Sequence, residues 1–341
     1  MTKSRYFKEN SSSKCLGFAS DEGLHANVDP LAYQLKMSQL RWLRTFALSL
    51  LVFPIRIILS LIILLVTYIV VVFGLLNLKT KDVNESKAID SSWRRRANKI
   101  QALLGRTLTR VSGLIVTVKG EMASVEEAPI LVVGPHSTGF DTIAVWWSDN
   151  PSYIVAEEFT KIPMLGKMFG LPLPVCVKRN DPDSRHNTRV EVMRRTNLHK
   201  HPNPDERWPQ ILIFPEGACG NRTVLMPFKL GAFYPGKPVQ PILLRYPNKV
   251  DTITWTQNTT MLSIWTTLSQ PFTRVEIEYL PVYHPNHEEQ KDAQLFASNV
   301  RNLMSKELEI PLSSITFQEA RSRSNITKNK EDIANVREKY Q

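Results

Sequence analysis

A histidine and an aspartate stand five residues apart, directly after a short apolar run, in the segment Gly134-Pro-His136-Ser-Thr-Gly-Phe-Asp141. If this segment is a strand-to-helix turn, the Asp141 carboxylate can fold back on the His136 ring. A carboxylate hydrogen-bonded to one ring nitrogen fixes the tautomer and leaves the other nitrogen free to take a proton from a hydroxyl. The two residues are therefore candidates for a general base and the group that orients it.

The same spacing occurs again at His287 and Asp292, where it predicts something different. Those residues fall in a polar stretch with helical patterning, and residues five apart do not share a face of a helix. We interpret this second pair as a solvated surface.

A second candidate segment follows the apolar run 211–214 and reads Pro-Glu-Gly-Ala-Cys-Gly-Asn-Arg-Thr over residues 215–223. Its glycines and its arginine can present backbone N–H groups and a guanidinium to an anionic headgroup. Taken alone, the segment is equally an ordinary turn that contains glycine. Cys219 is a potential nucleophile, but no base partner stands beside it in the sequence, so we do not assign it that role.

These segments need a scaffold of strands and helices, and the apolar pattern predicts one. Residues 130–133 and 211–214 are continuous apolar runs, which is typical of buried strands in an α/β sheet. Alternation of strands with helices along the chain implies an α/β fold in layers. We expect strands at 114–118, 130–133, 211–214, 239–244 and 274–280, and helices at 94–109, 142–147, 188–198 and 286–308.

Residues 57–76 form an apolar segment of twenty residues without a charged side chain, preceded by a further apolar stretch at 46–54. As a helix at ~1.5 Å per residue, twenty residues cover ~30 Å, the thickness of the hydrocarbon layer of a bilayer. Asp29-Pro30 predicts the start of an earlier amphipathic helix, which Pro54 and Arg56 are expected to interrupt. Basic residues flank both ends of the segment, so a membrane span and a re-entrant hairpin both stay open.

The chain divides into four regions by composition. Residues 1–28 are expected to be a mobile polar tail, and residues 322–341 a charged tail. Residues 29–91 hold the amphipathic and membrane segment, with its apolar core at 46–76. Residues 92–321 are predicted to form one folded domain, since no internal repeat or long Gly/Ser linker divides them.

Composition excludes several classes of protein. The 341 residues include 43% hydrophobic residues, so the chain can bury a core. Their formal net charge is +11. The cysteines Cys15, Cys176 and Cys219 are far apart and form no Cys/His cluster, which argues against a disulfide framework and a structural zinc site. Aromatic residues do not interleave with the basic clusters, so no nucleic-acid partner is expected.

Four ordered blocks of this sequence resemble the glycerolipid acyltransferase superfamily, in particular its lysophosphatidylcholine acyltransferase branch. The resemblance includes the stretch 244–255 and covers about residues 129–285, plus the membrane segment in front of them. The blocks are His136-Ser-Thr-Gly-Phe-Asp141, similar to the family's His-x4-Asp motif; the stretch that ends in Arg179; Phe214-Pro-Glu-Gly-Ala-Cys219-Gly-Asn-Arg222; and Val239-Gln-Pro241-Ile.

By this resemblance, the fold is a mixed α/β sheet flanked by helices, with a membrane helix or hairpin in front. The reaction it implies is transfer of an acyl group from acyl-CoA, a co-substrate, to the free hydroxyl of a lysophospholipid such as lysophosphatidylcholine. Neither a metal nor a redox cofactor is implied. In this scheme His136 is the base and Asp141 orients it. The ligands of the glycerophosphate are Arg179, Glu216, Gly217 and Arg222.

Glu216 needs a separate explanation within this scheme, because a carboxylate does not attract a phosphate. We expect it to contact a glycerol hydroxyl or to orient a neighbouring arginine. Apolar stretches at 162–166 and 168–175 are candidates for the walls of an acyl tunnel, and they are equally good candidates for the core.

The sequence departs from the family pattern at three points. Ala218 stands where the branch usually has threonine, Gly139 replaces a bulkier residue, and no calcium-binding EF-hand loop is found. We therefore expect no calcium regulation through EF-hands. The resemblance favours the endoplasmic reticulum membrane, with lipid droplets second, and a cytosolic active site at which the sequon Asn221-Arg-Thr is not glycosylated.

Other functions remain open at the level of sequence. Within the enzyme class, the acceptor can instead be lysophosphatidic acid or lysophosphatidylethanolamine, or the reaction can be acetyl transfer to an ether-linked lyso-lipid. Outside it, the alternative is a membrane-anchored protein that binds anionic lipids through its excess of Lys and Arg.

Overall fold

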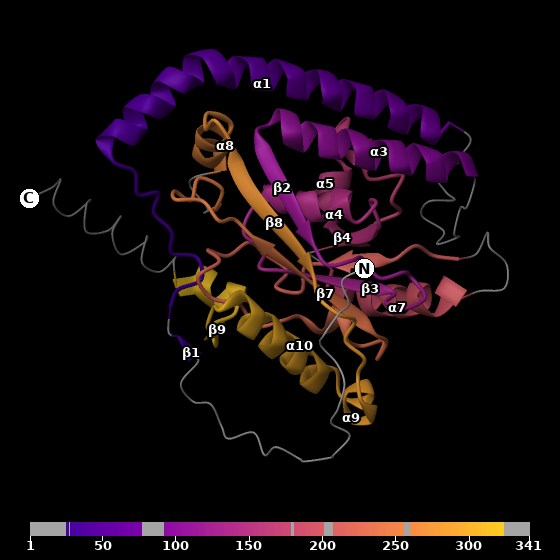
Figure 1. Cartoon of the computed structure of the whole chain (residues 1–341). Coiled ribbons are helices and arrows are strands. Elements are labelled where there is room, and N and C mark those ends of the chain that lie inside the picture. The colour runs from indigo at the N-terminus through magenta and orange to yellow at the C-terminus, as the bar shows by residue number, and fades with distance from the viewer. Residues whose placement is uncertain are drawn as a thin grey trace, which may run out of the picture.

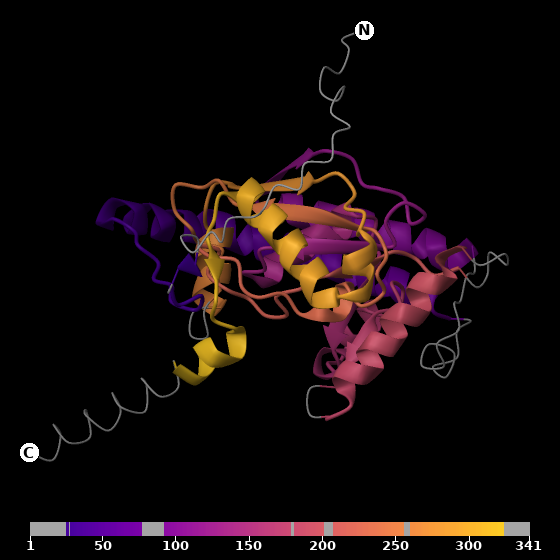
Figure 2. The same cartoon turned by 90° about the horizontal axis from the view of Figure 1, so that it is seen from below.

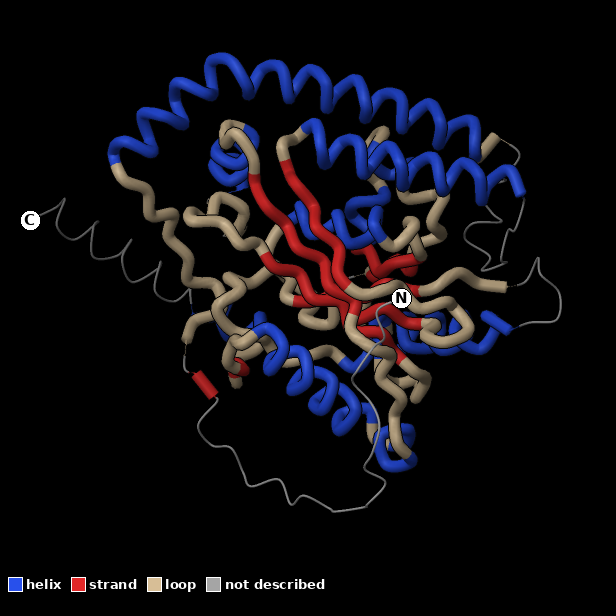
Figure 3. The backbone as a smooth tube through the Cα atoms, viewed as in Figure 1, coloured by secondary structure: helices blue, strands red, loops and turns tan. Residues whose placement is uncertain are grey.

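The computed structural model of the chain describes residues 25–26, 28–76, 92–178, 181–200, 207–255 and 260–323. Its central strands are β2 (Leu114–Lys119), β3 (Ile130–Gly134), β4 (Ser152–Ala156), β5 (Val175–Val177), β6 (Ile211–Ile213), β7 (Val239–Arg245) and β8 (Thr273–Tyr279). They form one seven-stranded sheet in the order β2-β8-β7-β3-β6-β4-β5 (Figure 3). Neighbouring strands run parallel except β7 and β8, which are antiparallel, so the expected mixed sheet is confirmed.

β3 lies at the centre of the sheet, where Ile130 pairs with both Ile211 of β6 and Val239 of β7. Side chains of β3 enter two separate cores, one on each face of the sheet. This double burial explains why β3 and β6 read as continuous apolar runs. Because β3 and β6 are parallel, their carboxyl ends meet at the same edge of the sheet, and the two candidate segments follow there.

Helices cover both faces of the sheet. The helices α3 (Ser92–Val111) and α4 (Ile143–Trp147) lie on one side, and α7 (Ser184–Asn197) and α10 (Ala293–Leu308) on the other (Figures 1 and 2). The smaller elements are α5 (Glu157–Thr160), α6 (Leu165–Met168), α8 (Thr260–Leu268), α9 (His287–Lys291), the 3-10 turns η1 (Gly139–Thr142), η2 (Leu198–Lys200) and η4 (Leu230–Ala232), and a parallel pair, β1 (His25–Ala26) with β9 (Leu312–Ser313).

The apolar segment forms one continuous helix, α1 (Gln39–Gly74), and this corrects two expectations. The helix begins at Gln39 rather than at Pro30, because the Ser38 side chain caps it by accepting a hydrogen bond from the Arg41 N–H at 3.4 Å. Pro54 lies inside the helix and does not end it. Among the described residues, α1 is long and apolar enough to cross a membrane.

α1 lies across the folded domain along its whole length, above α3 and α8 (Figure 1). Near its start, Phe46 packs on Trp265 of α8 with ring centroids 5.2 Å apart. In the middle, the Arg56 guanidinium donates to the backbone carbonyls of Leu268, Gln270 and Pro271. Near its end, Val71 shares a small buried cluster with Ala97 of α3 and Leu171. The helix is therefore attached to the domain at both ends and in the middle.

Several boundaries differ from the sequence prediction. The stretch 286–308 forms two helices, because Asp292 ends α9 and its side chain caps α10. His287 and Asp292 are both exposed, which confirms that this pair is a solvated surface. The strands β4 and β5 and the helix α8 were not predicted. The predicted tail at 1–28 lies almost entirely outside the described residues, as does most of the tail at 322–341.

Candidate active site

The loop after β3 folds Asp141 back onto His136, as the spacing predicts. The His136 Nδ1 atom lies 2.8 Å from Asp141 Oδ2. The same oxygen accepts hydrogen bonds from the backbone N–H groups of Ser137 at 2.6 Å and Thr138 at 2.9 Å. Thr138 and Asp141 form a capping box at the start of η1, so a local helix-start pattern turns the carboxylate toward the ring.

The second ring nitrogen of His136 faces the other candidate segment. The His136 Nε2 atom lies 3.4 Å from Cys219 Sγ, a contact between residues 83 positions apart. Burial by itself lowers the pKa of the His136 imidazole, but Cys219 and Asp141 outweigh it and raise that pKa above its usual value. Sequence reasoning found no partner for Cys219, because the fold rather than the sequence brings the two segments together.

Glu216 joins the two loops from inside the protein. Its side chain is buried, with the residue 3% exposed, and its oxygens accept the backbone N–H groups of His136 at 2.7 Å and Met226 at 3.0 Å. Burial raises the pKa of this carboxyl to about 7. In return, the Gly220 N–H donates to the His136 carbonyl at 2.7 Å. Glu216 therefore braces the loop that carries His136 against its own loop.

Gly217 lies within the turn that follows β6. Its φ of 69° is in the left-handed region, and its N–H donates to the Phe214 carbonyl at 3.0 Å. A Cβ atom at this position would lie 2.3 Å from the Lys229 Nζ atom. The turn therefore favours glycine at this position. The Lys229 side chain, a cation that the sequence analysis did not identify, lies beside it.

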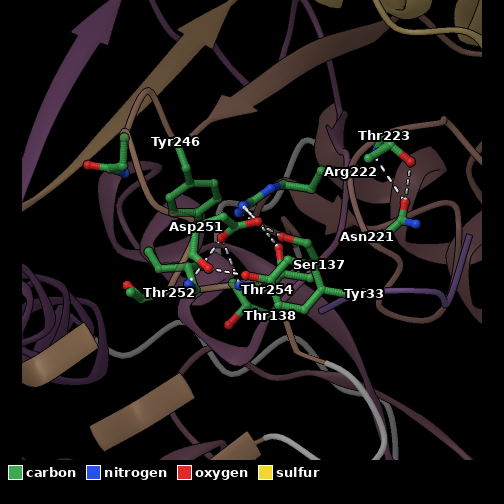
Figure 4. Close-up of polar contacts among 12 residues, drawn as sticks. Tyr33, Ser137, Thr138, Asn221, Arg222, Thr223, Tyr246, Asp251, Thr252 and Thr254 are labelled. Atoms are coloured by element: carbon green, nitrogen blue, oxygen red, sulfur yellow. Dashed lines mark hydrogen bonds and ion pairs between the residues drawn. The ribbon is translucent and has the colours of Figure 1, made fainter. Parts of the chain in front are cut away.

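Arg222 is held at the edge of the His136 loop by three partners (Figure 4). Its guanidinium lies 2.6 Å from Asp251 Oδ2, donates to Ser137 Oγ at 3.3 Å, and stacks 4.4 Å from the ring centroid of Tyr246. Burial raises the pKa of Asp251, but Arg222 and the Thr254 hydrogen bonds outweigh this and lower it. The Tyr246 hydroxyl in turn donates to Asp141 Oδ1.

Tyr246 and Asp251 are members of the site that sequence reasoning missed. Both lie in the stretch 244–255, which was noted for its resemblance alone, and neither has a spacing that suggests chemistry. Arg179, predicted to contact the glycerophosphate, lies outside the described residues.

The segment before α1 is fixed to the second loop through Asn221. The Asn221 backbone N–H donates to the Pro30 carbonyl at 2.8 Å, and its side-chain amide donates to the carbonyls of Asp29 and Ala32, both at 2.9 Å. Asn221 is 5% exposed. Its amide nitrogen is therefore buried and engaged, which leaves no room for a glycan at this sequon.

An apolar cavity of about 290 Å³ lies behind the His136 loop and reaches α1. A Cβ atom at Gly139 would lie 2.3 Å from the Trp255 ring, so the glycine that departs from the family pattern makes room for this indole. The cavity walls come from α1, α3, the loop with η1 and α4, and α8, and include Ser60, Leu108, Phe140, Trp146, Trp255 and Ile264.

The described residues contain no group of three or more His, Cys, Asp or Glu side chains that could hold a metal ion. The chemistry gathered here is instead that of an oriented imidazole, beside a guanidinium and in front of an apolar cavity. Such a site can take a proton from a hydroxyl, contact an anion and hold a hydrocarbon chain.

Comparisons with known proteins agree with this chemistry. Residues 115–245 match the family model "Acyltransferase". The chain is 44% identical over 296 residues to lysophosphatidylcholine acyltransferase 2 of Mus musculus, a match that covers 86% of this chain and 53% of the relative. It is 39% identical over 306 residues to lysophosphatidylcholine acyltransferase 1 of Homo sapiens, covering 88% and 55%. The chain thus spans about half the length of the curated relatives it matches.

A solved structure supports the fold. The 1-acyl-sn-glycerophosphate (LPA) acyltransferase PlsC from Thermotoga maritima matches with a TM-score of 0.51 at 16% identity, over 79% of this chain and 96% of that one. At this identity the likeness concerns the fold alone. Taken with the sequence matches, it shows that the chain belongs to the glycerolipid acyltransferase superfamily, in its lysophosphatidylcholine acyltransferase branch.

Proposed function

We propose that this protein is an acyl-CoA-dependent lysophospholipid O-acyltransferase whose preferred acceptor is lysophosphatidylcholine. The observation that carries the proposal is the 2.8 Å contact between His136 Nδ1 and Asp141, which leaves Nε2 directed at the second loop. The names of the relatives with about 40% identity support the choice of acceptor.

In the proposed reaction, His136 acts as a general base. The acceptor hydroxyl takes the place of Cys219 next to Nε2 and gives its proton to that nitrogen while its oxygen bonds to the thioester carbonyl carbon. The carbon–sulfur bond then breaks, and CoA leaves as a thiol with the proton from the imidazolium. Asp141 stabilises the charged imidazolium and keeps Nδ1 protonated, so Nε2 is the nitrogen that accepts.

The acyl chain of the donor belongs in the cavity behind the His136 loop. Its volume of about 290 Å³ and its apolar lining suit part of a hydrocarbon chain. Phe140 and Trp255 line it next to the dyad, and Ser60 of α1 lines it at the membrane helix. A chain that enters from the bilayer side therefore ends with its thioester near His136.

The phosphate of the acceptor is assigned first to Arg222, at the rim of the site. Arg222 is 13% exposed at its side chain and can exchange its contact with Asp251 for a phosphate oxygen. Arg179 is proposed as a second ligand on the ground of the family motif. Glu216 and Gly217 act from within: the former braces the His136 loop and the latter permits the turn beside Lys229.

The mode of membrane association follows from the attachment of α1. Its 36 residues span about 54 Å at ~1.5 Å per residue, well beyond the ~30 Å of the hydrocarbon layer. An upright crossing would pull the attached domain into the bilayer, because Phe46, Arg56 and Val71 all contact that domain. We infer that α1 lies in the plane of the interface with its outer apolar side chains, such as Leu50 and Leu61, in the lipid.

Within the cell, we propose the endoplasmic reticulum membrane, with the active site on the cytosolic side and lipid droplets as a second location. The buried, hydrogen-bonded amide of Asn221 supports the cytosolic side, because it cannot carry a glycan without breaking its contacts to Asp29 and Ala32.

The proposal is tested with the full chain reconstituted in vesicles, by measuring both CoA release and the lipid product. Oleoyl-CoA and acetyl-CoA are each paired with lysophosphatidylcholine, lysophosphatidic acid, lysophosphatidylethanolamine and an ether-linked lyso-lipid. We expect the highest kcat/KM for oleoyl-CoA with lysophosphatidylcholine. A higher value for another pair reassigns the substrate. If no pair gives CoA release, the proposed enzymatic function is overturned and an anionic-lipid-binding protein is favoured.

A further inference from the structure

The Asp141 carboxylate has one hydrogen-bond partner that the His-x4-Asp spacing does not supply. Asp141 is fully buried. Its Oδ2 atom accepts hydrogen bonds from the His136 ring and from the backbone N–H groups of Ser137 and Thr138, all in the same loop. Its Oδ1 atom accepts a hydrogen bond from the hydroxyl of Tyr246, 105 residues further along the chain. The two oxygens are therefore fixed from two different directions.

Tyr246 is itself held in place. It follows the end of β7, the strand next to β3, so its ring reaches the loop that carries the dyad. The Arg222 guanidinium stacks on the ring with its centre 4.4 Å from the centroid, and Asp251 holds that guanidinium at 2.6 Å (Figure 4). Burial and the nearby Asp141 charge raise the pKa of the Tyr246 phenol, so it remains a hydrogen-bond donor.

We propose that Tyr246 is a positioning residue that completes a His136–Asp141–Tyr246 relay and sets the basicity of His136. This inference rests on the proposed function for its meaning in catalysis. Its physical content, the effect of the Tyr246 hydroxyl on the proton affinity of His136, can be measured without that function.

The direction of the effect follows from the charge on Asp141. A hydroxyl that donates to Oδ1 offsets part of the negative charge of the carboxylate. Less of that charge is then left to stabilise the imidazolium, so the hydroxyl lowers the pKa of His136 relative to a site without it. Loss of the hydroxyl should therefore keep His136 protonated to higher pH.

Other charged and titratable groups surround the dyad, and they stay unchanged in the test. Cys219 faces Nε2 of His136, and Glu216 accepts the His136 backbone N–H and is itself influenced by Arg301. Arg222 stacks on the Tyr246 ring, donates to Ser137 Oγ and is paired with Asp251. Replacement of tyrosine by phenylalanine leaves that ring in place, so the change is confined to one hydroxyl.

The test compares wild type, Tyr246→Phe and Tyr279→Phe in the full chain. Tyr279 is the matched control, because it is a buried tyrosine whose hydroxyl is paired with the uncharged Ser148 Oγ at 3.0 Å. The first readout is the pH dependence of His136 modification by diethyl pyrocarbonate, which reacts with neutral imidazole and is quantified on the His136 peptide. The second is the pH profile of kcat/KM with oleoyl-CoA and lysophosphatidylcholine.

For Tyr246→Phe we expect the midpoint of modification and the acid limb of kcat/KM to move up by about one pH unit. At neutral pH this lowers kcat/KM about tenfold, while the KM for the lysolipid stays the same. A 3-fluorotyrosine at position 246, a stronger donor of nearly the same size, should move both midpoints down, and it serves if the phenylalanine variant fails to fold.

An unchanged midpoint in Tyr246→Phe, or an equal shift in Tyr279→Phe, overturns the proposal. If the modification midpoint shifts while the wild type releases no CoA, the proposed enzymatic function fails and the positioning role of Tyr246 stands. The two failures are therefore distinguishable.

Discussion

The Glu216 carboxylate accepts a hydrogen bond from the backbone N–H of His136 at 2.7 Å, across 80 positions of sequence. Its other oxygen accepts the Met226 N–H, and the Gly220 N–H returns a bond to the His136 carbonyl. The residue that carries the proposed base is thus fixed by the loop that follows β6, as well as by its own. Two loops that are separate motifs in the sequence form one unit in the fold.

Replacement of Glu216 by glutamine should weaken this unit. The glutamine amide group would point one N–H donor at another, so one buried donor loses its acceptor, at a cost of about 1–3 kcal/mol in the free energy of unfolding. We expect a lower melting temperature for Glu216→Gln and unchanged melting for Glu288→Gln on the exposed side of α9. Equal melting temperatures for wild type and Glu216→Gln would show that the hydrogen bonds of Glu216 do not contribute to the stability of the fold.

The titration of Glu216 gives a second prediction. Burial raises its pKa from 4.5 to about 7, so the folded protein binds a proton at this site that the unfolded chain has lost. Its contribution to the free energy of unfolding is full below about pH 4.5 and declines as the pH rises to about 7. In denaturant titrations, the difference between wild type and Glu216→Gln should change over this pH range. A constant difference would contradict the raised pKa.

The sequence predicted the framework of the site because its strongest signals are local. The continuous apolar runs at 130–133 and 211–214 mark strands buried on both faces, and the loop between β3 and η1 is short. The fold-back of Asp141 onto His136 is also local, since Thr138 and Asp141 form a capping box within four residues. Such features depend on neighbours in the chain.

The remaining parts of the site depend on contacts between distant residues. Tyr246 reaches Asp141 only because β7 lies beside β3, a pairing that the residues around it do not reveal. The start of α1 was predicted nine residues too early, because Asn221 holds the carbonyls of Asp29, Pro30 and Ala32 outside a helix. Pro54 is tolerated because contacts of Phe46 and Arg56 hold the helix on both sides of it.

Replacement of Cys219 by serine distinguishes a thiol that only raises the pKa of His136 from a thiol that acts as a nucleophile. Cys219 raises the pKa of His136, so its removal should shift the acid limb of the kcat/KM profile to lower pH, with the maximal rate retained. Cys176→Ser, at the other thiol among the described residues, is the control and should leave the profile unchanged. Complete loss of activity in Cys219→Ser would instead identify Cys219 as a nucleophile and contradict direct transfer.

Gly139 should control the shape of the cavity proposed to hold the acyl chain. In Gly139→Ala the added methyl meets the Trp255 ring, and overpacking of this kind costs about 1–3 kcal/mol. Because that ring lines the cavity, kcat/KM for oleoyl-CoA should fall several-fold relative to acetyl-CoA. Gly231→Ala is the matched control, since a Cβ there meets no atom within 4 Å. An unchanged ratio of the two donors in Gly139→Ala would place the acyl chain elsewhere.

The central claim is that His136 is the general base of an acyl transfer, and the most direct test compares His136→Ala with His287→Ala. Both histidines precede an aspartate by five residues, but His287 and Asp292 are exposed and unconnected to the site. The measurement is CoA release with oleoyl-CoA and lysophosphatidylcholine in vesicles. The account predicts a loss of about 10²–10⁴-fold in kcat for His136→Ala and wild-type rates for His287→Ala. Equal rates for wild type and His136→Ala would contradict it.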